Sequence, residues 1–358
     1  MDRSAPAANP PLDQVVDRLA RFEPTHLPVI SLYLNLQADQ HGKDNFAPFV
    51  RKELPQRVGS YPAGSEARAS LDKDVERIEQ YLANEVPASA NGLALFACSG
   101  LDGFFEAVSL DAPIQRHRLS IAPEPHLYPL ALLLDQHPPH AVVHADSQSA
   151  RIFVFALGQT IRNATVEARE KVKRMSAGGW SQMRFQRHVE QLQAEHAREL
   201  AGALERIVKE DGIAHVILAG DDVTVALVRG ELGQELSAKV VDAMKVDANA
   251  AEHEIMEAAA GVLREHDARS DAETIERVVG EYLAGNLGAA GGKAVREALE
   301  RGQVSELYLT AVDPGEAETM ADELVAKARQ TSARVRFIED PALLAEHDGV
   351  AAALRYRA

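Results

Sequence analysis

A long run of helical periodicity in the middle of the chain constrains the fold more than any other feature. Between about Ser181 and Lys209 apolar residues recur at the spacing of one helix face, and they are Phe185, Val189, Leu192, Leu200, Leu204 and Ile207. A helix rises about 1.5 Å per residue, so one of this length can carry a preceding loop well away from a sheet. That preceding stretch, Met175–Gly179, ends in a glycine pair and is followed by Trp180, the only tryptophan of the chain. Adjacent glycines permit close approach of the backbone to a partner, so we predict a projecting loop that makes a contact.

Positive charge gathers on the same stretch. Residues 169–188 contain six basic residues and one acid, Glu170, whereas the whole chain has 38 Lys+Arg against 54 Asp+Glu and a net charge of −16. The basic residues are Arg169, Lys171, Lys173, Arg174, Arg184 and Arg187. Such an island in an acidic protein attracts phosphates. A solvated surface loop leading into a helix fits the charge and glycine content equally well.

Composition bounds the class of protein. At 358 residues the chain is too long for one ordinary core, which favours two or three domains. An apolar fraction of 46% and a charged fraction of 26% are typical of globular proteins in water. No apolar run has membrane-spanning length, and the polar segment 1–11 lacks the apolar core of a signal peptide, so we expect no membrane association and a cytoplasmic location. The single Cys98 lies in an apolar run, which excludes an internal disulfide and predicts a buried thiol.

Strand and helix patterns alternate and predict an α/β protein of three domains. An N-terminal α/β domain, 1–125, has helical patterns at 12–22, 45–58 and 65–84 and strands at 28–34, 93–97 and 103–110. A central domain, 126–270, has strands at 130–134, 141–145, 151–156, 160–168, 215–219 and 239–245 around the long helix. A helix pair over 249–283 leads to a C-terminal domain, 271–358, with strands at 304–310 and 334–338 and a helix at 316–330.

Other constellations point to structure rather than chemistry. Gly220-Asp221-Asp222 follows a strand, and an aspartate helix cap is favoured there over magnesium binding. The trio His137, His140 and His144 is interpreted as ordinary turn residues rather than a metal site. The glycine-rich run 285–292 lacks the Lys-Ser/Thr of a phosphate-binding loop. We therefore predict no metal and no cofactor.

The run Gly178–Phe185 resembles the loop of the archaeo-eukaryotic peptide-chain release factors. In that family a Gly-Gly-Gln runs into Ser, two further residues, Arg and Phe, and then a long basic helix. The residues that match in register are Gly178, Gly179, Ser181, Arg184 and Phe185. Trp180 stands where the family has its catalytic Gln, and Gln182 follows two residues later. The chain is most similar to bacterial members of this superfamily, including hibernation factors, and more distantly to Pelota.

The resemblance implies a fold and a set of partners. The central domain would be a ribonuclease-H-like mixed sheet with a projecting Gly-rich loop and long helix, and the C-terminal domain an α-β-α sandwich. The N-terminal domain would correspond to the decoding domain, but the family's Asn-Ile-Lys-Ser motif is absent from 1–125, so stop-codon reading is unsupported. The ribosome, with its RNA and the end of the P-site tRNA, becomes the expected partner, with elongation factor Tu or another translational GTPase beside it.

Two functions then compete for the loop. In the first, the protein occupies the ribosomal A site as a hibernation or stalled-ribosome binder, with Trp180 stacking on a base and the basic side chains of Lys173, Arg174, Arg184 and Arg187 on phosphates. In the second, Gln182 positions a water that hydrolyses peptidyl-tRNA, although the bulk of Trp180 opposes this. A non-ribosomal adaptor protein is a third reading. The resemblance favours the non-enzymatic binder.

Overall fold

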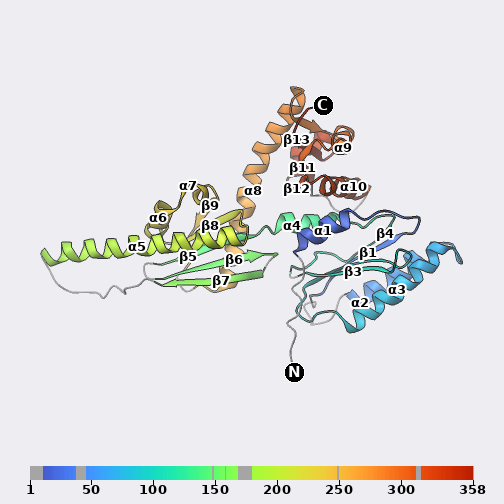
Figure 1. Ribbon diagram of the computed structural model, residues 1–358, viewed down its shortest axis with the longest axis horizontal. Coiled ribbons are helices and arrows are strands. Elements are labelled where there is room, and N and C mark those ends of the chain that lie inside the picture. The colour runs from blue at the N-terminus through green and yellow to red at the C-terminus, as the bar shows by residue number, and fades with distance from the viewer. Residues whose placement is uncertain are drawn as a thin grey trace. The chain divides into compact units, whose positions relative to one another are not determined.

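The computed structural model describes residues 11–37, 46–110, 112–146, 149–157, 159–167, 180–247, 250–311 and 316–357, with the backbone alone at 159, 180–186 and 316–319. Its strands form three sheets, as the ribbon in Figure 1 shows. The chain separates into two compact units, Met1–Gln136 together with Ala272–Ala358, and His137–Asp271. The first unit contains two of the sheets and the second unit contains the third. The predicted mixed α/β class is confirmed.

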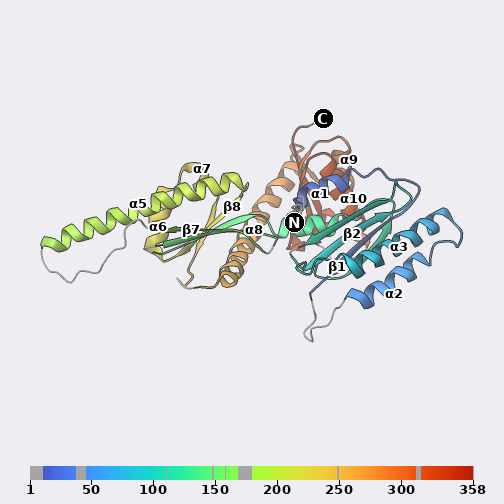
Figure 2. The same cartoon turned by 60° about the horizontal axis from the view of Figure 1, so that its bottom comes forward.

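The N-terminal sheet is antiparallel, with strand order β3-β2-β1-β4. Its strands are β1 (Val29–Asn35), β2 (Gly92–Cys98), β3 (Phe104–Leu110) and β4 (Arg118–Ala122). Every residue of β2 and all but the last of β1 are buried, which matches their nearly continuous apolar sequences. Two helices, α2 (Phe46–Val58) and α3 (Glu66–Asn84), cover one face of this sheet (Figure 2). The predicted helices and strands of this region are confirmed, and β4 is an addition.

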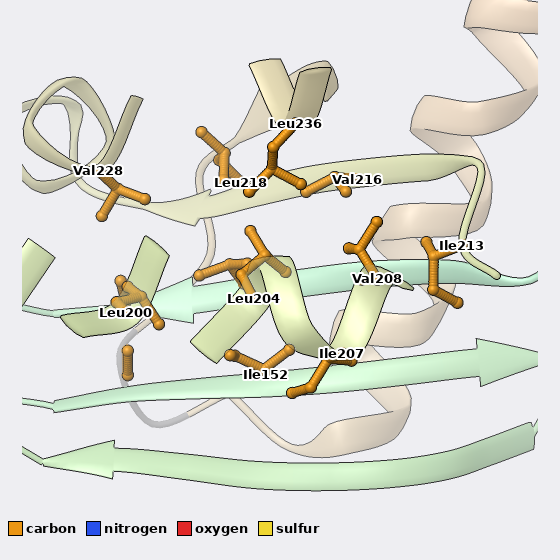
Figure 3. Close-up of a cluster of buried hydrophobic side chains, with 14 of the residues drawn as sticks. Ile152, Leu200, Leu204, Ile207, Val208, Ile213, Val216, Leu218, Val228 and Leu236 are labelled. Atoms are coloured by element: carbon orange, nitrogen blue, oxygen red, sulfur yellow. The ribbon is translucent and has the colours of Figure 1, made fainter. Parts of the chain in front are cut away.

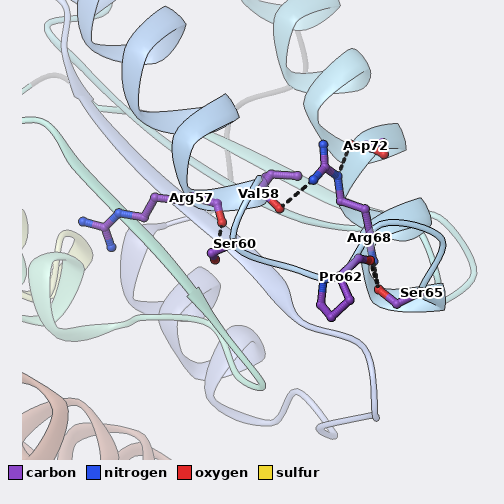
Figure 4. A network of polar contacts seen from close by, with 7 residues as sticks. All are labelled: Arg57, Val58, Ser60, Pro62, Ser65, Arg68 and Asp72. Atoms are coloured by element: carbon purple, nitrogen blue, oxygen red, sulfur yellow. Dashed lines mark hydrogen bonds and ion pairs between the residues drawn. The ribbon is translucent and has the colours of Figure 1, made fainter.

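Side chains close the corner between α2 and α3, as Figure 4 shows. Ser65 caps α3 by accepting the backbone N–H of Arg68 at 3.2 Å. The Arg68 guanidinium donates back to the carbonyl of Val58 at 3.2 Å and to the Asp72 carboxylate at 2.8 Å. One arginine therefore satisfies an end carbonyl of α2 and braces the first turns of α3.

Two further helices, α1 (Leu12–Ala20) and α4 (Tyr128–Gln136), belong to the same unit. The prediction of a strand at 130–134 is wrong, because these residues lie in α4. Leucine and alanine are strong helix formers. The Asp322 carboxylate accepts the N–H groups of Leu127 and Tyr128 at 2.6 and 2.9 Å, which satisfies donors at the helix start.

The C-terminal sheet has strand order β10-β13-β11-β12. Its strands are β10 (Gly288–Ala290), β11 (Val304–Thr310), β12 (Arg334–Ile338) and β13 (Val350–Leu354). Helix α10 (Glu316–Gln330) connects the parallel pair β11 and β12, and α9 (Gly292–Glu300) lies beside it (Figure 1). The end of α8 and the 3-10 helix η1 (Pro341–His347) pack with Tyr308, Ile338 and Ala351 in one core. The predicted α-β-α sandwich is confirmed.

The sheet of the second unit is mixed, with strand order β7-β6-β5-β8-β9. Its strands are β5 (His140–Ala145), β6 (Ser149–Ala156), β7 (Gln159–Glu167), β8 (His215–Gly220) and β9 (Val240–Met244). β5, β6 and β7 are antiparallel neighbours, whereas β5, β8 and β9 run parallel. The predicted mixed sheet is therefore confirmed.

Helices cover both faces of this sheet. Helix α5 (Trp180–Glu210), α6 (Asp222–Glu231) and α7 (Gln234–Ser237) lie over one face, and their core is drawn in Figure 3. Its labelled side chains are Ile152, Leu200, Leu204, Ile207, Val208, Ile213, Val216, Leu218, Val228 and Leu236. The first part of α8 (Glu252–Leu283) covers the other face.

Helix α8 corrects a second expectation. The predicted helix pair over 249–283 is one continuous helix of 32 residues. Gly261 and Gly280 lie inside it, and glycine lowers helix stability by about 1 kcal/mol without forcing a break. Its apolar residues serve two cores in turn, Ile255 and Leu263 in the second unit and Ile275 and Val278 in the first. Packing at both ends of the helix outweighs the local glycine penalty.

Candidate functional site

The predicted contact loop lies between the edge strand β7 and the helix α5. β7 ends at Glu167 and α5 begins at Trp180. The predicted site residues Lys173, Arg174, Gly178 and Gly179 lie outside the described residues. Their roles stay predictions.

Four other predicted residues lie on the first turns of α5, where the structure describes the backbone. These are Trp180, Ser181, Gln182 and Arg184. The expected helix over 181–209 is confirmed, with bounds one residue wider at each end. An α-helix turns about 100° per residue, so positions 180, 184 and 187 lie along one side of the axis and position 182 lies about 200° from position 180. The helix thus separates Gln182 from Trp180 and groups Trp180 with the two arginine positions.

The first half of α5 extends beyond the core that holds its second half. Of the side chains described in this helix, 187–195 are exposed or partly exposed, and the first buried ones are His196 and Ala197. The sixteen residues before His196 correspond to about 24 Å of helix. Among them Arg187 is exposed. Figure 1 shows this half of α5 running past the ends of the strands of its own sheet.

The start of α5 is electrostatically suited to anions. The first N–H groups of a helix have no intrahelical acceptor, and the helix dipole places partial positive charge there. The first turn contains no acidic residue, whereas α6 and α8 both begin with acids. Together with the basic residues counted in the sequence, this favours phosphate near the loop.

The second half of α5 is held by apolar packing. Leu200 and Leu204 are fully buried, and Ile207 and Val208 are nearly so. They pack on side chains of β5, β6 and β8 in the core of Figure 3. Burying each large aliphatic side chain contributes about 1.5–3 kcal/mol, so the sheet is a firm base for the projecting half.

The Gly220-Asp221-Asp222 segment is structural, as predicted. Asp221 caps α6, accepting the N–H groups of Val223 and Thr224 at 3.0 Å each and the Thr224 hydroxyl at 2.7 Å. These hydrogen bonds lower the pKa of the Asp221 carboxyl. Asp222 pairs with Lys245 at 2.8 Å on the surface. The described residues contain no group of three His, Cys, Asp or Glu arranged to hold a metal ion.

Two of the three histidines lie in β5, and His137 lies three residues before that strand. His140 and His144 are buried in β5, so the expectation of turn residues holds for neither. The ring Nδ1 of His140 lies 3.0 Å from the Pro138 carbonyl, and that of His144 lies 2.9 Å from the Arg151 guanidinium. Burial lowers the pKa of His137, His140 and His144. Both strand rings thus have partners within the second unit.

Three further residues, Cys98, Asp135 and Asp146, have structural surroundings. Cys98 is buried in β2, as expected, and burial raises the pKa of its thiol. Asp135 accepts the N–H of Phe337 at 2.7 Å, and Asp146 accepts the N–H of Ser149 at 2.7 Å. Each carboxylate thus has a structural role. Every helix in the described part of the chain is too short or too polar to cross a membrane.

The described fold is an α/β protein with a long helix, α5, packed on a mixed sheet, and the glycine pair precedes that helix in the sequence. Residues 125–264 match baeRF_family10, the bacterial archaeo-eukaryotic release factor family 10. The match covers the sheet of the second unit and the whole of α5, and it spans less than half of the chain. This part of the chain is therefore similar to the archaeo-eukaryotic release factor family.

Solved structures of translation termination factors and Pelota proteins also resemble the chain. S. cerevisiae Dom34, a translation termination-like factor, is 14% identical, with 75% of this chain and 80% of that chain covered and a TM-score of 0.44. Archaeal Pelota, from a model of ribosome-bound Pelota and ABCE1, is 16% identical, with 97% and 94% covered and a TM-score of 0.43. The archaeal termination factor aRF1 is 16% identical, with 96% and 97% covered and a TM-score of 0.29. No curated protein matches the chain. Among these likenesses, the family match over 125–264 carries the proposed function.

Proposed function

We propose that this protein is a ribosome-associated translation factor that occupies the A site and brings residues 175–188 close to the peptidyl-transferase centre. The observation that carries the proposal is the family match over 125–264, which contains the loop and α5. The projecting half of α5 supports it, because about 24 Å of helix before His196 can carry the preceding residues into a confined site. The acid-free helix start supports contacts with RNA phosphates.

Within that function, binding without hydrolysis is the form we propose, as in ribosome hibernation or the capture of stalled ribosomes. Trp180 stands where the family motif has its catalytic glutamine, and an indole offers a stacking face and one N–H donor but lacks the carbonyl acceptor of a glutamine amide. The positions of Trp180, Arg184 and Arg187 share one side of α5, which suits one RNA surface that offers both bases and phosphates. The chain resembles the bacterial hibernation factor Balon in lacking the orthodox Gly-Gly-Gln.

Hydrolysis of peptidyl-tRNA through Gln182 is the competing function. Its position lies about 200° around the helix from position 180, so the two positions lie on opposite sides of the helix start. The two functions therefore predict opposite importance for the two residues.

Co-sedimentation with purified ribosomes tests the proposal. Loss of one stacking contact costs about 1–3 kcal/mol, so Trp180→Ala should weaken binding between about fivefold and a hundredfold. Trp180→Phe should retain most of the affinity. Lys209→Ala, at the other end of α5, is the matched control and should leave binding unchanged. Wild-type protein that stays in the supernatant would refute ribosome association and leave the adaptor reading.

A release assay on ribosomes with peptidyl-tRNA in the P site separates the two forms of the function. The proposal expects tight binding with no release by wild type. Release that disappears in Gln182→Ala would identify a hydrolase and contradict the binder. Repeating the binding assay with elongation factor Tu and GTP tests whether a translational GTPase delivers the factor, which would show as faster or tighter association.

A further inference from the structure

A small cavity of the second unit lies under α5, where the helix meets the sheet. Three elements line it, the end of β5, the middle of α5 and the first turns of α6. The lining residues are Ala145, Asp146, Gln193, His196, Ala197, Leu200, Thr224, Leu227 and Val228. Ala145 pairs with Gly220 at the carboxyl ends of the parallel strands β5 and β8, so the cavity lies at the carboxyl ends of these two inner strands. The sequence patterns do not predict this cavity.

Among the residues that line this cavity, His196 is unusual because it is a buried ionisable side chain without a hydrogen bond. Its side chain is 6% exposed, and neither ring nitrogen has a hydrogen-bond partner. Among the side chains of α5 that the structure describes, from Arg187 onward, it is also the first buried one. The histidine therefore lies at the joint where the helix changes from free to packed.

The groups around His196 are poorly suited to a charged ring. Two carboxylates act on it, Asp146 from the end of β5 and Glu199 from its own helix, and the cavity residues from α6 carry no charge. Asp146 already accepts the N–H and the hydroxyl of Ser149, at 2.7 and 3.0 Å. The Thr224 hydroxyl is donated to Asp221. Burial lowers the pKa of His196, and the two carboxylates offset that effect only in part.

We propose that His196 is a proton-sensitive joint, at which a neutral ring keeps α5 packed on the sheet and proton uptake loosens the helix around the cavity. A proton adds a positive charge beside Ala197, Leu200 and Val228, which offer it no hydrogen bond. Opening the joint hydrates the ring and removes that penalty. The consequence is a projecting half of α5 that is held rigidly near neutral pH and less rigidly in mild acid.

Hydrogen exchange of the α5 backbone, measured on the full chain and corrected for intrinsic rates, tests the proposal without ribosomes. Between about pH 7.5 and about pH 5.5 we expect the opening of residues 196–208 to rise about fivefold in wild type, since proton uptake by the open form shifts the equilibrium. His196→Gln keeps polar atoms but cannot gain the charge, so its opening should be independent of pH in this range. His188→Gln, an exposed histidine on the same helix, is the matched control and should keep the wild-type response.

Two results would overturn the proposal. An acid response in His196→Gln equal to that of wild type would assign the effect to the other buried histidines, His137, His140 and His144. Where the variant does not fold, NMR titration of labelled wild-type protein decides. A ring of His196 that titrates at or above 6.5, its ordinary value, contradicts the proposal. A lower midpoint, followed by the amide shifts of α5, supports it.

Discussion

Substitution of Gly220 by alanine is expected to disrupt the second unit at the centre of its sheet. Gly220 ends β8 with φ +148°, a conformation that residues with a Cβ rarely adopt, and it pairs with Ala145 at the end of β5. A Cβ built there lies 2.3 Å from the Ala145 carbonyl oxygen, and ordinary contact begins at 3.4 Å. The two parallel strands must separate by about 1 Å or the backbone must change conformation.

The loss of stability is the sum of two costs, backbone strain and overpacking. A strained backbone conformation costs about 1–3 kcal/mol, and overpacking in a rigid interior costs about 1–3 kcal/mol more. We therefore expect Gly220→Ala to lower the free energy of unfolding of this unit by about 2–6 kcal/mol. Each 1.4 kcal/mol is a factor of about ten in the opening equilibrium, so β5 and β8 amides should exchange at least tenfold faster.

A second glycine in the same unit provides a control of opposite sign. Gly202 lies inside α5, and a Cβ added there meets no atom within 4 Å. Alanine is the better helix former by about 0.5–1 kcal/mol, so Gly202→Ala should stabilise the unit. Native-state hydrogen exchange resolved by peptide is the suitable assay, because a chain of two units does not have one unfolding equilibrium. If Gly220→Ala costs less than about 1 kcal/mol, or behaves like Gly202→Ala, the steric argument is wrong.

Other predictions concern packing, capping and pH. Leu204→Ala should cost about 2–5 kcal/mol, since this fully buried side chain holds α5 on the sheet, and the exposed neighbour Glu205→Ala should cost little in the same hydrogen-exchange assay. Asp221→Ala should cost about 1 kcal/mol through loss of the α6 cap, and Asp221→Asn much less, by thermal melting. His140 has a lowered pKa, so the unfolded chain takes up its proton first as pH falls below 6.5, and the second unit should lose stability from there toward the lowered pKa. His140→Phe should remove that part of the dependence in unfolding curves at several pH values, and an unchanged pH profile would contradict the assignment. Asp74 of the first unit should give the opposite pH dependence of stability. Burial raises its pKa, so the stability of that unit should decline as pH rises through 3.8 toward the raised value.

Some of this protein is determined by local sequence. The helical periodicity before Lys209 predicts α5 to within a residue at each end, because one apolar face repeated over eight turns is hard to satisfy in any other way. The buried strands β1 and β2, the buried Cys98 and the Asp221 cap follow for similar reasons. In each case the decisive interactions lie within one element or one turn. The loop motif likewise predicts the superfamily, which the match over 125–264 bears out.

Contacts between residues distant in sequence decided the rest. The leucine run at 130–134 suits a buried strand or a buried helix, and the choice is made by Asp322, which binds the N–H groups at the start of α4 from almost two hundred residues away. The local sequence around 130–134 gives no sign that Asp322 binds there. The two ends of α8 are likewise held by different cores, so its continuity is invisible to local propensity.

His196 makes the same point for the candidate site. In the sequence it is one of two histidines spaced along a helix, and nothing in that spacing separates the exposed His188 from the buried ring. Its character comes from three elements that meet over it, the end of β5, α5 itself and α6. Local sequence determines which residues form each helix and strand, because propensity and periodicity act over a few residues. Burial, pKa and the point at which α5 leaves the sheet depend on which elements pack together, so only the tertiary structure decides them.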